Sequence, residues 1–105
     1  MASMKNILIL CTGNSCRSIL AEAYINNMSD KWRAYSAGSR PTSEVHPLAL
    51  ETLASQGIDA SYVRSKNWHE FAGSDAPHMD VIVTVCDNAA GEPRPAWPGY
   101  PPARH

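Results

Sequence analysis

The sequence predicts an α/β protein with a small parallel β-sheet between layers of helix, a three-layer α/β/α arrangement. Two observations predict this class. Strand-like and helical segments alternate along the chain, and such alternation favours parallel strands joined by right-handed crossovers. The first strand-like run is continuously apolar, as strands buried on both faces of a parallel sheet are. In sheets of this kind, ligands bind beyond the carboxyl ends of the strands.

The first two predicted elements flank a short loop. A strand is predicted over Lys5–Leu10, followed by a helix from about Ser18 to Met28. Ser18 is expected to cap this helix, because a serine hydroxyl can accept hydrogen bonds from the first helical N–H groups. The apolar face of the helix is expected to contain residues at helical spacing, namely Leu20, Ala23, Tyr24 and Met28.

The rest of the chain repeats the pattern. The expected elements are a second strand over 32–37, a helix between 47 and 57, a short helical turn over 65–71 and a third strand over 79–85. The second helix has Pro47 in its first turn and Gly57 as its stop signal. Its core-facing residues are expected to be Leu48, Thr52 and Leu53.

Length, composition and charge are those of an ordinary globular domain, taken as residues 1–105. Of the 105 residues, 44% are apolar, and the net charge of −1 provides no basic field for nucleic acid or an anionic membrane surface. No apolar run is long enough for a membrane span, and we expect no signal peptide. Three cysteines and four scattered histidines show no metal-ligand spacing. A reducing cytoplasm and no metal are therefore expected.

The end of the sequence differs in composition from the rest. Five prolines lie between positions 93 and 102, and proline lacks the N–H group that helices and inner strands need. Residues 93–105 are therefore predicted to form an extended tail. Such a tail is either a structural loop or a ligand for a proline-binding domain.

The segment Cys11–Ser18, with the sequence Cys-Thr-Gly-Asn-Ser-Cys-Arg-Ser, follows the first strand and precedes the first helix. A loop in this position turns backbone N–H groups inward beside a helix N-terminus and so favours a tetrahedral oxyanion. Arg17 adds a planar guanidinium that can hold two anion oxygens. The same field favours the reactive thiolate of Cys11. Cys11 as a buried core cysteine is the alternative, and the combined context favours the functional interpretation.

Three separated motifs resemble the low-molecular-weight tyrosine phosphatase superfamily, and within it the arsenate reductases. The loop Cys11–Ser18 matches both branches. Two further motifs resemble the reductase branch. One is Arg64-Ser65-Lys66 with Trp68, Glu70 and Phe71. The other is the segment Val83–Glu92, which continues to Trp97-Pro98-Gly99. The resemblance covers almost the whole chain and implies a low-molecular-weight phosphatase-like fold.

The resemblance also implies a role for each loop residue. Cys11 would attack arsenate, Asn14 would brace the loop, and Ser18 would donate a hydrogen bond to the Cys11 thiolate. The oxyanion would be held by the loop residues Thr12, Gly13, Asn14, Ser15, Cys16 and Arg17. Cys16 would be a bystander or would protect Cys11 in a disulfide.

Cys86 would be the second redox thiol of this reaction, and a buried strand-end cysteine is the alternative. A thiol that attacks the arsenate-bearing sulfur releases arsenite and leaves a disulfide. Many family members carry a further cysteine after the Gly-Glu pair, where this chain has Pro93-Arg94-Pro95. The resemblance therefore implies no bound cofactor but an external reductant: glutathione with glutaredoxin, mycothiol or thioredoxin.

Members of the family continue past the position of His105 into an Asp-Pro segment, a fourth strand and a terminal helix. The fold is therefore expected to lack its last strand and helix, including the Asp that serves phosphatases as general acid. The outer edge of the third strand, residues 80–85, is expected to be bare and to pair with a second copy or to swap elements. The competing functions are phosphotyrosine or phosphomonoester hydrolysis and an oxyanion-binding remnant with weak catalysis.

Overall fold

The computed structural model describes residues 5–14, 16–42, 44–73, 76–85 and 103–104. Its four strands form one sheet in the order β2-β1-β3-β4, with every neighbouring pair parallel. The strands are β1 (Lys5–Cys11), β2 (Trp32–Gly38), β3 (Val81–Thr84) and β4 (Ala103–Arg104). The predicted α/β class with a small parallel sheet is confirmed.

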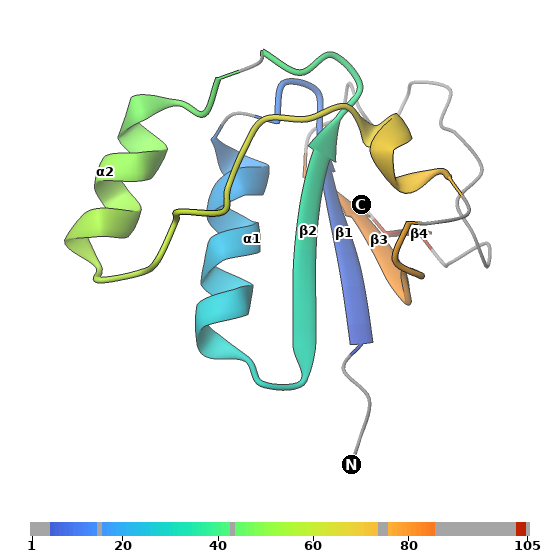
Figure 1. The fold of residues 1–105 in the computed structure, drawn as a ribbon, viewed down its shortest axis with the longest axis horizontal. Helices are drawn as coiled ribbons and strands as arrows, with labels where there is room; N and C mark the ends of the chain where they lie inside the picture. The colour runs from blue at the N-terminus through green and yellow to red at the C-terminus, as the bar shows by residue number, and fades with distance from the viewer. Residues whose placement is uncertain (1–4, 15, 43, 74–75, 86–102, 105) are drawn as a thin grey trace.

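In the described part of the chain, the helices lie on one side of the sheet and a 3₁₀ turn lies on the other (Figure 1). Helix α1 (Arg17–Met28) packs on β1 and β2, and α2 (Pro47–Ser55) packs on the outer side of α1. The turn η1 (Trp68–Phe71) packs near β2 on the opposite face. The connection between β1 and β2 thus covers one face of the sheet. The connection between β2 and β3 begins on that same side with α2 and crosses to the other face, where η1 covers it.

Two apolar clusters hold these layers together. The larger lies between the sheet and the η1 side and contains Leu8, Leu10, Ala37, Trp68, Phe71, Met79 and Ile82. The smaller joins α1 to α2 and the chain after it, through Ala23, Leu53 and Ile58. Because alternate residues of a strand point to opposite faces, Ile9 faces the α1 side and is also buried. The first strand is therefore buried on both faces at its centre, as predicted.

Several helix details differ from the prediction. Helix α1 begins at Arg17, its N-cap residue is Cys16, and Ser18 is fully buried within the first turn instead of capping it. Met28 is 78% exposed and Leu48 is 61% exposed, so neither belongs to the core. Helix α2 buries Ala49 and Leu53 because it packs mainly on α1, which leaves only a narrow stripe of the helix covered.

The outer edge of β3 is not bare, contrary to the prediction. Ile82 pairs with Ala103 and Val83 pairs with Arg104, so a two-residue fourth strand lies along this edge. The expected tail over residues 93–105 is therefore partly a strand, and its residues 93–102 lie outside the described part of the chain. Among the described residues, no helix has the length and apolar character needed to cross a bilayer.

Candidate active site

The loop between β1 and α1 lies at the carboxyl end of the sheet, where the chain turns to different faces. Helix α1 leaves β1 toward one face, and β3, on the other side of β1, is reached from the opposite face (Figure 1). Such a switch point leaves a crevice at the strand ends in doubly wound sheets. The fold therefore places the Cys11–Ser18 loop where this architecture binds its ligands.

Asn14 is the central brace of the loop. Its side chain is fully buried, and its backbone has φ 46°, in the left-handed region that asparagine tolerates better than most residues. The amide Nδ2 donates to Ser18 Oγ at 2.9 Å, and Oδ1 accepts from the backbone N–H of Lys66 at 2.8 Å. These two bonds fix the strained turn to α1 on one side and to the 65–66 segment on the other.

Neighbouring segments bind the carbonyl groups of the loop. The Thr12 carbonyl accepts from Arg40 N at 2.9 Å. The Gly13 carbonyl accepts from Thr42 N at 3.1 Å and from Ser65 Oγ at 3.1 Å. In a trans peptide the C=O and the following N–H point in opposite directions. The N–H groups of Gly13 and Asn14 are therefore turned away from these segments, as an anion-binding nest requires.

Gly38, at the end of β2, packs directly against the backbone of this loop. A Cβ atom on Gly38 would collide with the Thr12 carbonyl oxygen and would lie 2.7 Å from the Cys11 carbonyl oxygen. Its N–H also donates to the carbonyl of Lys66 at 2.9 Å. Only glycine allows this close approach, so β2 contributes to the site through the absence of a side chain.

The residues predicted to carry the chemistry lie at the two ends of this loop. Cys11 ends β1 and is half-buried, and Cys11 and Cys16 are not joined in a disulfide. Ser18 accepts its hydrogen bond from Asn14, and therefore its own hydrogen stays available as a donor. Arg17 is exposed, and its Nη1 donates to the carbonyl of Val85 at 3.4 Å.

The structure thus brings together Cys11, Thr12, Gly13, Asn14, Cys16, Arg17 and Ser18 in one strand–loop–helix unit. Two predicted site residues, Ser15 and Cys86, lie outside the described residues. Val85, which directly precedes Cys86 in the sequence, donates its N–H to the carbonyl of Leu10 at 2.9 Å. The end of β3 is therefore held beside the start of the loop.

A buried polar cluster under the loop was not identified as functional from the sequence. Glu22 and Lys66 are 4% and 7% exposed, with Lys66 Nζ 3.8 Å from Glu22 Oε1, and Ser36 Oγ donates to the same oxygen. Burial raises the pKa of Glu22 and lowers the pKa of Lys66, while their mutual attraction opposes both shifts. One signal was available: Glu22 follows Ser18 by four residues and so shares its helix face.

The described residues contain no group of three His, Cys, Asp or Glu side chains that could hold a metal ion. The groups that converge at the loop are instead a thiol, a hydroxyl, backbone N–H groups and a guanidinium. This set suits an anion and a thiolate nucleophile.

The fold and the loop define a doubly wound α/β protein with a cysteine at the mouth of an oxyanion-type loop. Residues 6–99 match the family described as low molecular weight phosphotyrosine protein phosphatase, and the chain belongs to this family. The predicted low-molecular-weight phosphatase-like fold is thereby confirmed.

Relatives with more specific names are arsenate reductases. The chain is 38% identical over 90 residues to an arsenate reductase of Bacillus licheniformis, a match that covers 84% of this chain and 61% of that protein. The chain thus spans less than two thirds of that relative. A solved arsenate reductase in the phosphate-binding state has a TM-score of 0.73 at 28% identity, over 97% of this chain and 76% of the other. A thioredoxin-dependent arsenate reductase of Corynebacterium glutamicum has a TM-score of 0.73 at 26% identity, over 99% and 50%.

Proposed function

We propose that this chain reduces arsenate to arsenite in a thiol-dependent reaction, with Cys11 as the nucleophile and Cys86 as the second redox thiol. The observation that carries the proposal is the braced loop that follows Cys11 at the end of β1, in which Asn14 joins Ser18 to the 65–66 segment. The arsenate reductases among the similar proteins support the choice of substrate.

The loop binds the oxyanion and activates the thiol together. Backbone N–H groups of residues 12–17 and the Arg17 guanidinium neutralise the anion, and α1 presents its N-terminus to the same place. The Ser18 hydroxyl donates to the Cys11 thiolate while Asn14 fixes its orientation. Both effects favour the thiolate over the thiol and lower the barrier to attack.

The chemistry proceeds in two displacements. The Cys11 thiolate attacks the arsenic atom of arsenate, an S–As bond forms, and an oxygen leaves as hydroxide or water. The Cys86 thiolate then attacks the Cys11 sulfur, the S–S bond forms and the S–As bond breaks with its electron pair moving to arsenic. Arsenic(V) becomes arsenic(III), arsenite leaves, and two thiols have become one disulfide.

The position of β3 supports Cys86 as the attacking thiol. Val85 N donates to the carbonyl of Leu10, which precedes Cys11, and the Val85 carbonyl accepts from Arg17 at the other end of the loop. Cys86 is the next residue along the chain, and consecutive Cα atoms are about 3.8 Å apart. A disulfide requires Cα atoms within about 7 Å.

An external thiol completes the cycle by reducing the Cys11–Cys86 disulfide. Glutathione with glutaredoxin, mycothiol and thioredoxin are the candidates, and the thioredoxin-dependent neighbour favours the last. Such a reductant implies a reducing compartment, so we place the protein in the cytoplasm. Phosphate, as a tetrahedral analogue, is expected to compete for the loop.

Phosphotyrosine or phosphomonoester hydrolysis is the second candidate, because the family as a whole takes its name from that activity. The two functions share Cys11 and the loop but differ in their need for Cys86. An oxyanion-binding protein with little turnover is the third candidate. Hydrolysis of p-nitrophenyl phosphate that is unaffected by Cys86→Ser, without arsenite release, would establish the phosphatase instead.

The test of the proposal is arsenite release from the reduced protein and arsenate, with each of the three reductants in turn. The unsubstituted protein should release arsenite, Cys11→Ser and Cys86→Ser should not, and one reductant should sustain repeated turnover. Arg17→Ala should remove the protection that phosphate gives Cys11 against iodoacetamide. Arsenite release that survives Cys86→Ser would show that another thiol attacks Cys11.

Association of two copies through the 80–85 edge stays a prediction. Since β4 pairs with Ile82 and Val83, a second copy would have to displace it or extend the sheet beyond it. Light scattering coupled to size-exclusion chromatography measures this directly, and a monomer at high concentration would contradict it.

A further inference from the structure

A closed ring of contacts lies beneath the oxyanion loop, and we define it as the buried ring of Asn14, Ser18, Glu22 and Lys66. Asn14 bonds to Ser18 through its Nδ2 and to the N–H of Lys66 through its Oδ1. The Lys66 ammonium lies 3.8 Å from the Glu22 carboxylate. Helix α1 connects Glu22 back to Ser18. All four residues are buried.

The helical part of this ring has a fixed length. Ser18 and Glu22 are four residues apart in α1, so their side chains lie one above the other on the same face. Ser18 contacts the loop and Glu22 contacts the 65–66 segment. The helix therefore sets the distance between the two points at which the loop and its neighbouring segment are attached.

The side chain of Lys66 has contacts unusual for a lysine. Its Nζ donates at 2.7 Å to the carbonyl of Arg64, two residues earlier in the chain. The same Nζ lies 3.8 Å from the carboxylate of Glu22 on α1. The Glu22 carboxylate also accepts from Ser36 on β2. Burial costs both charges their hydration, and each is stable there only because the other is present. The pair thus attaches the 65–66 segment to α1 and, through Ser36, to β2.

We propose that Lys66 and Glu22 are positioning residues, whose buried pair fixes the backbone of Lys66 against Asn14 and so holds the oxyanion loop in its anion-binding form. The inference rests on the proposed oxyanion function of the loop. Neither side chain needs to touch the anion. Their effect passes through the 2.8 Å bond from Lys66 N to Asn14 Oδ1, which holds Asn14 at positive φ.

The test compares Cys11 in three proteins by mass spectrometry of the alkylated site. Iodoacetamide reactivity is followed against pH, with and without inorganic phosphate, in the unsubstituted chain, in Lys66→Met and in the double variant Glu22→Gln/Lys66→Met. The double variant leaves no buried charge in the pair, so its stability should stay close to that of the parent. Arg64→Gln is the matched control, because it breaks the exposed Arg64–Glu70 ion pair of the same segment.

We expect both Lys66 variants to need about ten- to hundred-fold more phosphate for half-protection of Cys11, since small displacements of a binding group have effects of this size. The pH midpoint of Cys11 alkylation should rise with them, while Arg64→Gln matches the parent. Normal protection and an unchanged midpoint in a folded double variant would overturn the positioning role. Absence of phosphate protection in the unsubstituted chain would instead overturn the proposed oxyanion site itself.

Discussion

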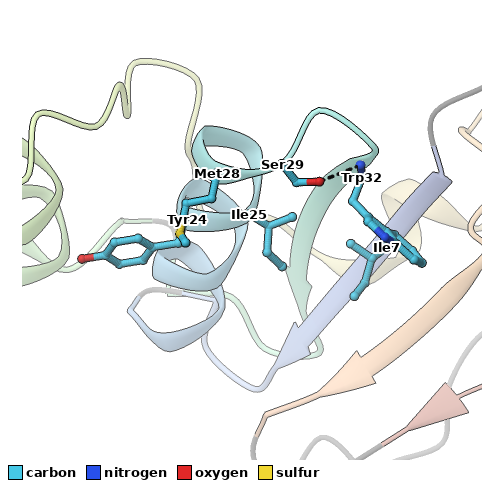
Figure 2. A pocket seen from close by; sticks show the side chains of 6 residues that line it. All are labelled: Ile7, Tyr24, Ile25, Met28, Ser29 and Trp32. Carbon is cyan, nitrogen blue, oxygen red and sulfur yellow. Dashed lines mark hydrogen bonds between the residues drawn. The ribbon is translucent and has the colours of Figure 1, made fainter.

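The two ends of α1 differ in the kind of contact that holds them: hydrogen-bonded polar groups at one end and apolar side chains at the other. At its N-terminal end, polar groups are buried and bonded to one another: Asn14 to Ser18, Lys66 to Asn14, and Lys66 to Glu22. At its C-terminal end, an open apolar pocket of about 390 Å³ lies between the helix and the first residues of the strands, and Figure 2 shows the side chains that line it. They are Ile7, Tyr24, Ile25, Met28, Ser29 and Trp32.

The two ends differ in how strictly they fix the distances and directions between the contacting side chains. A buried polar group must find its partner at one distance and direction, and leaving it unpaired costs about 1–3 kcal/mol. Apolar contacts have no direction, so a pocket of this kind tolerates displacement and substitution. We therefore expect changes at the loop end to alter both anion binding and stability. Changes at the pocket end should alter stability alone.

The largest effects are expected at the loop end, and Gly38→Ala is one of them. The added methyl group would collide with the backbone carbonyls of Thr12 and Cys11, which cannot move without opening the loop. We expect a loss of about 3 kcal/mol in the free energy of unfolding and no measurable phosphate protection of Cys11. Urea unfolding and the alkylation assay measure the two quantities.

Gly73→Ala is the control for this change, because a Cβ at Gly73 meets nothing within 4 Å. It should leave phosphate protection unchanged and alter stability only slightly. Equal protection in Gly38→Ala and Gly73→Ala would show that the loop does not depend on the close approach of β2.

Replacement of Asn14 separates the backbone strain from the hydrogen bonds. Asn14→Ala removes both amide bonds, leaves the Lys66 N–H without its acceptor, and keeps a Cβ at φ 46°. We expect a loss of about 3 kcal/mol in the free energy of unfolding. Asn14→Gly removes the same bonds but accepts this φ, so it should recover about 1 kcal/mol of that loss.

Both Asn14 variants should lose phosphate protection of Cys11 to the same degree, because neither has the amide. The comparison is made with thermal unfolding beside the alkylation assay. Protection restored by Asn14→Gly would mean that the loop needs the backbone conformation and not the bonds to Ser18 and Lys66.

The sequence alone predicted the part of the fold that follows from local signals. Three features could be predicted because each depends on a few adjacent residues. They are the apolar run of β1, the two ends of the second helical segment at Pro47 and Gly57, and the order of the elements. The Cys11–Ser18 loop was recognised for the same reason. Ser18 was assigned to the helix cap because the sequence does not show that Asn14 already binds its hydroxyl.

The buried ring and the short fourth strand were not predicted, since both depend on residues far apart in the sequence. Lys66 lies 52 residues after Asn14, and Ala103 pairs with Ile82 across the Pro-rich stretch. A lysine and a glutamate ordinarily indicate exposed positions. Only the three-dimensional arrangement shows that each of them is the partner that allows the other to be buried.

A change at the apolar end should separate stability from anion binding. Ile7 is half-buried in the pocket wall, facing α1. Ile7→Ala should lower the free energy of unfolding by about 1–2 kcal/mol, less than for a fully buried isoleucine. Urea unfolding measures this loss. The phosphate concentration for half-protection of Cys11 should not change, and a tenfold increase would mean that the two ends are coupled through α1.

The smallest effect is expected at the exposed Arg64–Glu70 pair, which adjoins the loop end but lies outside the buried ring. The Arg64 guanidinium donates two bonds to Glu70 and lowers the pKa of that carboxyl. A lowered carboxyl pKa stabilises the fold above the ordinary value of 4.5 and loses this contribution as the pH falls through the lowered pKa. Glu70→Gln should therefore cost about 0–1 kcal/mol of the free energy of unfolding near neutral pH, as exposed pairs do.

The unfolding curves of parent and variant should converge as the pH is lowered below 4.5. A gap that stays constant down to acid pH would show that Glu70 stabilises the segment by packing and not by its charge.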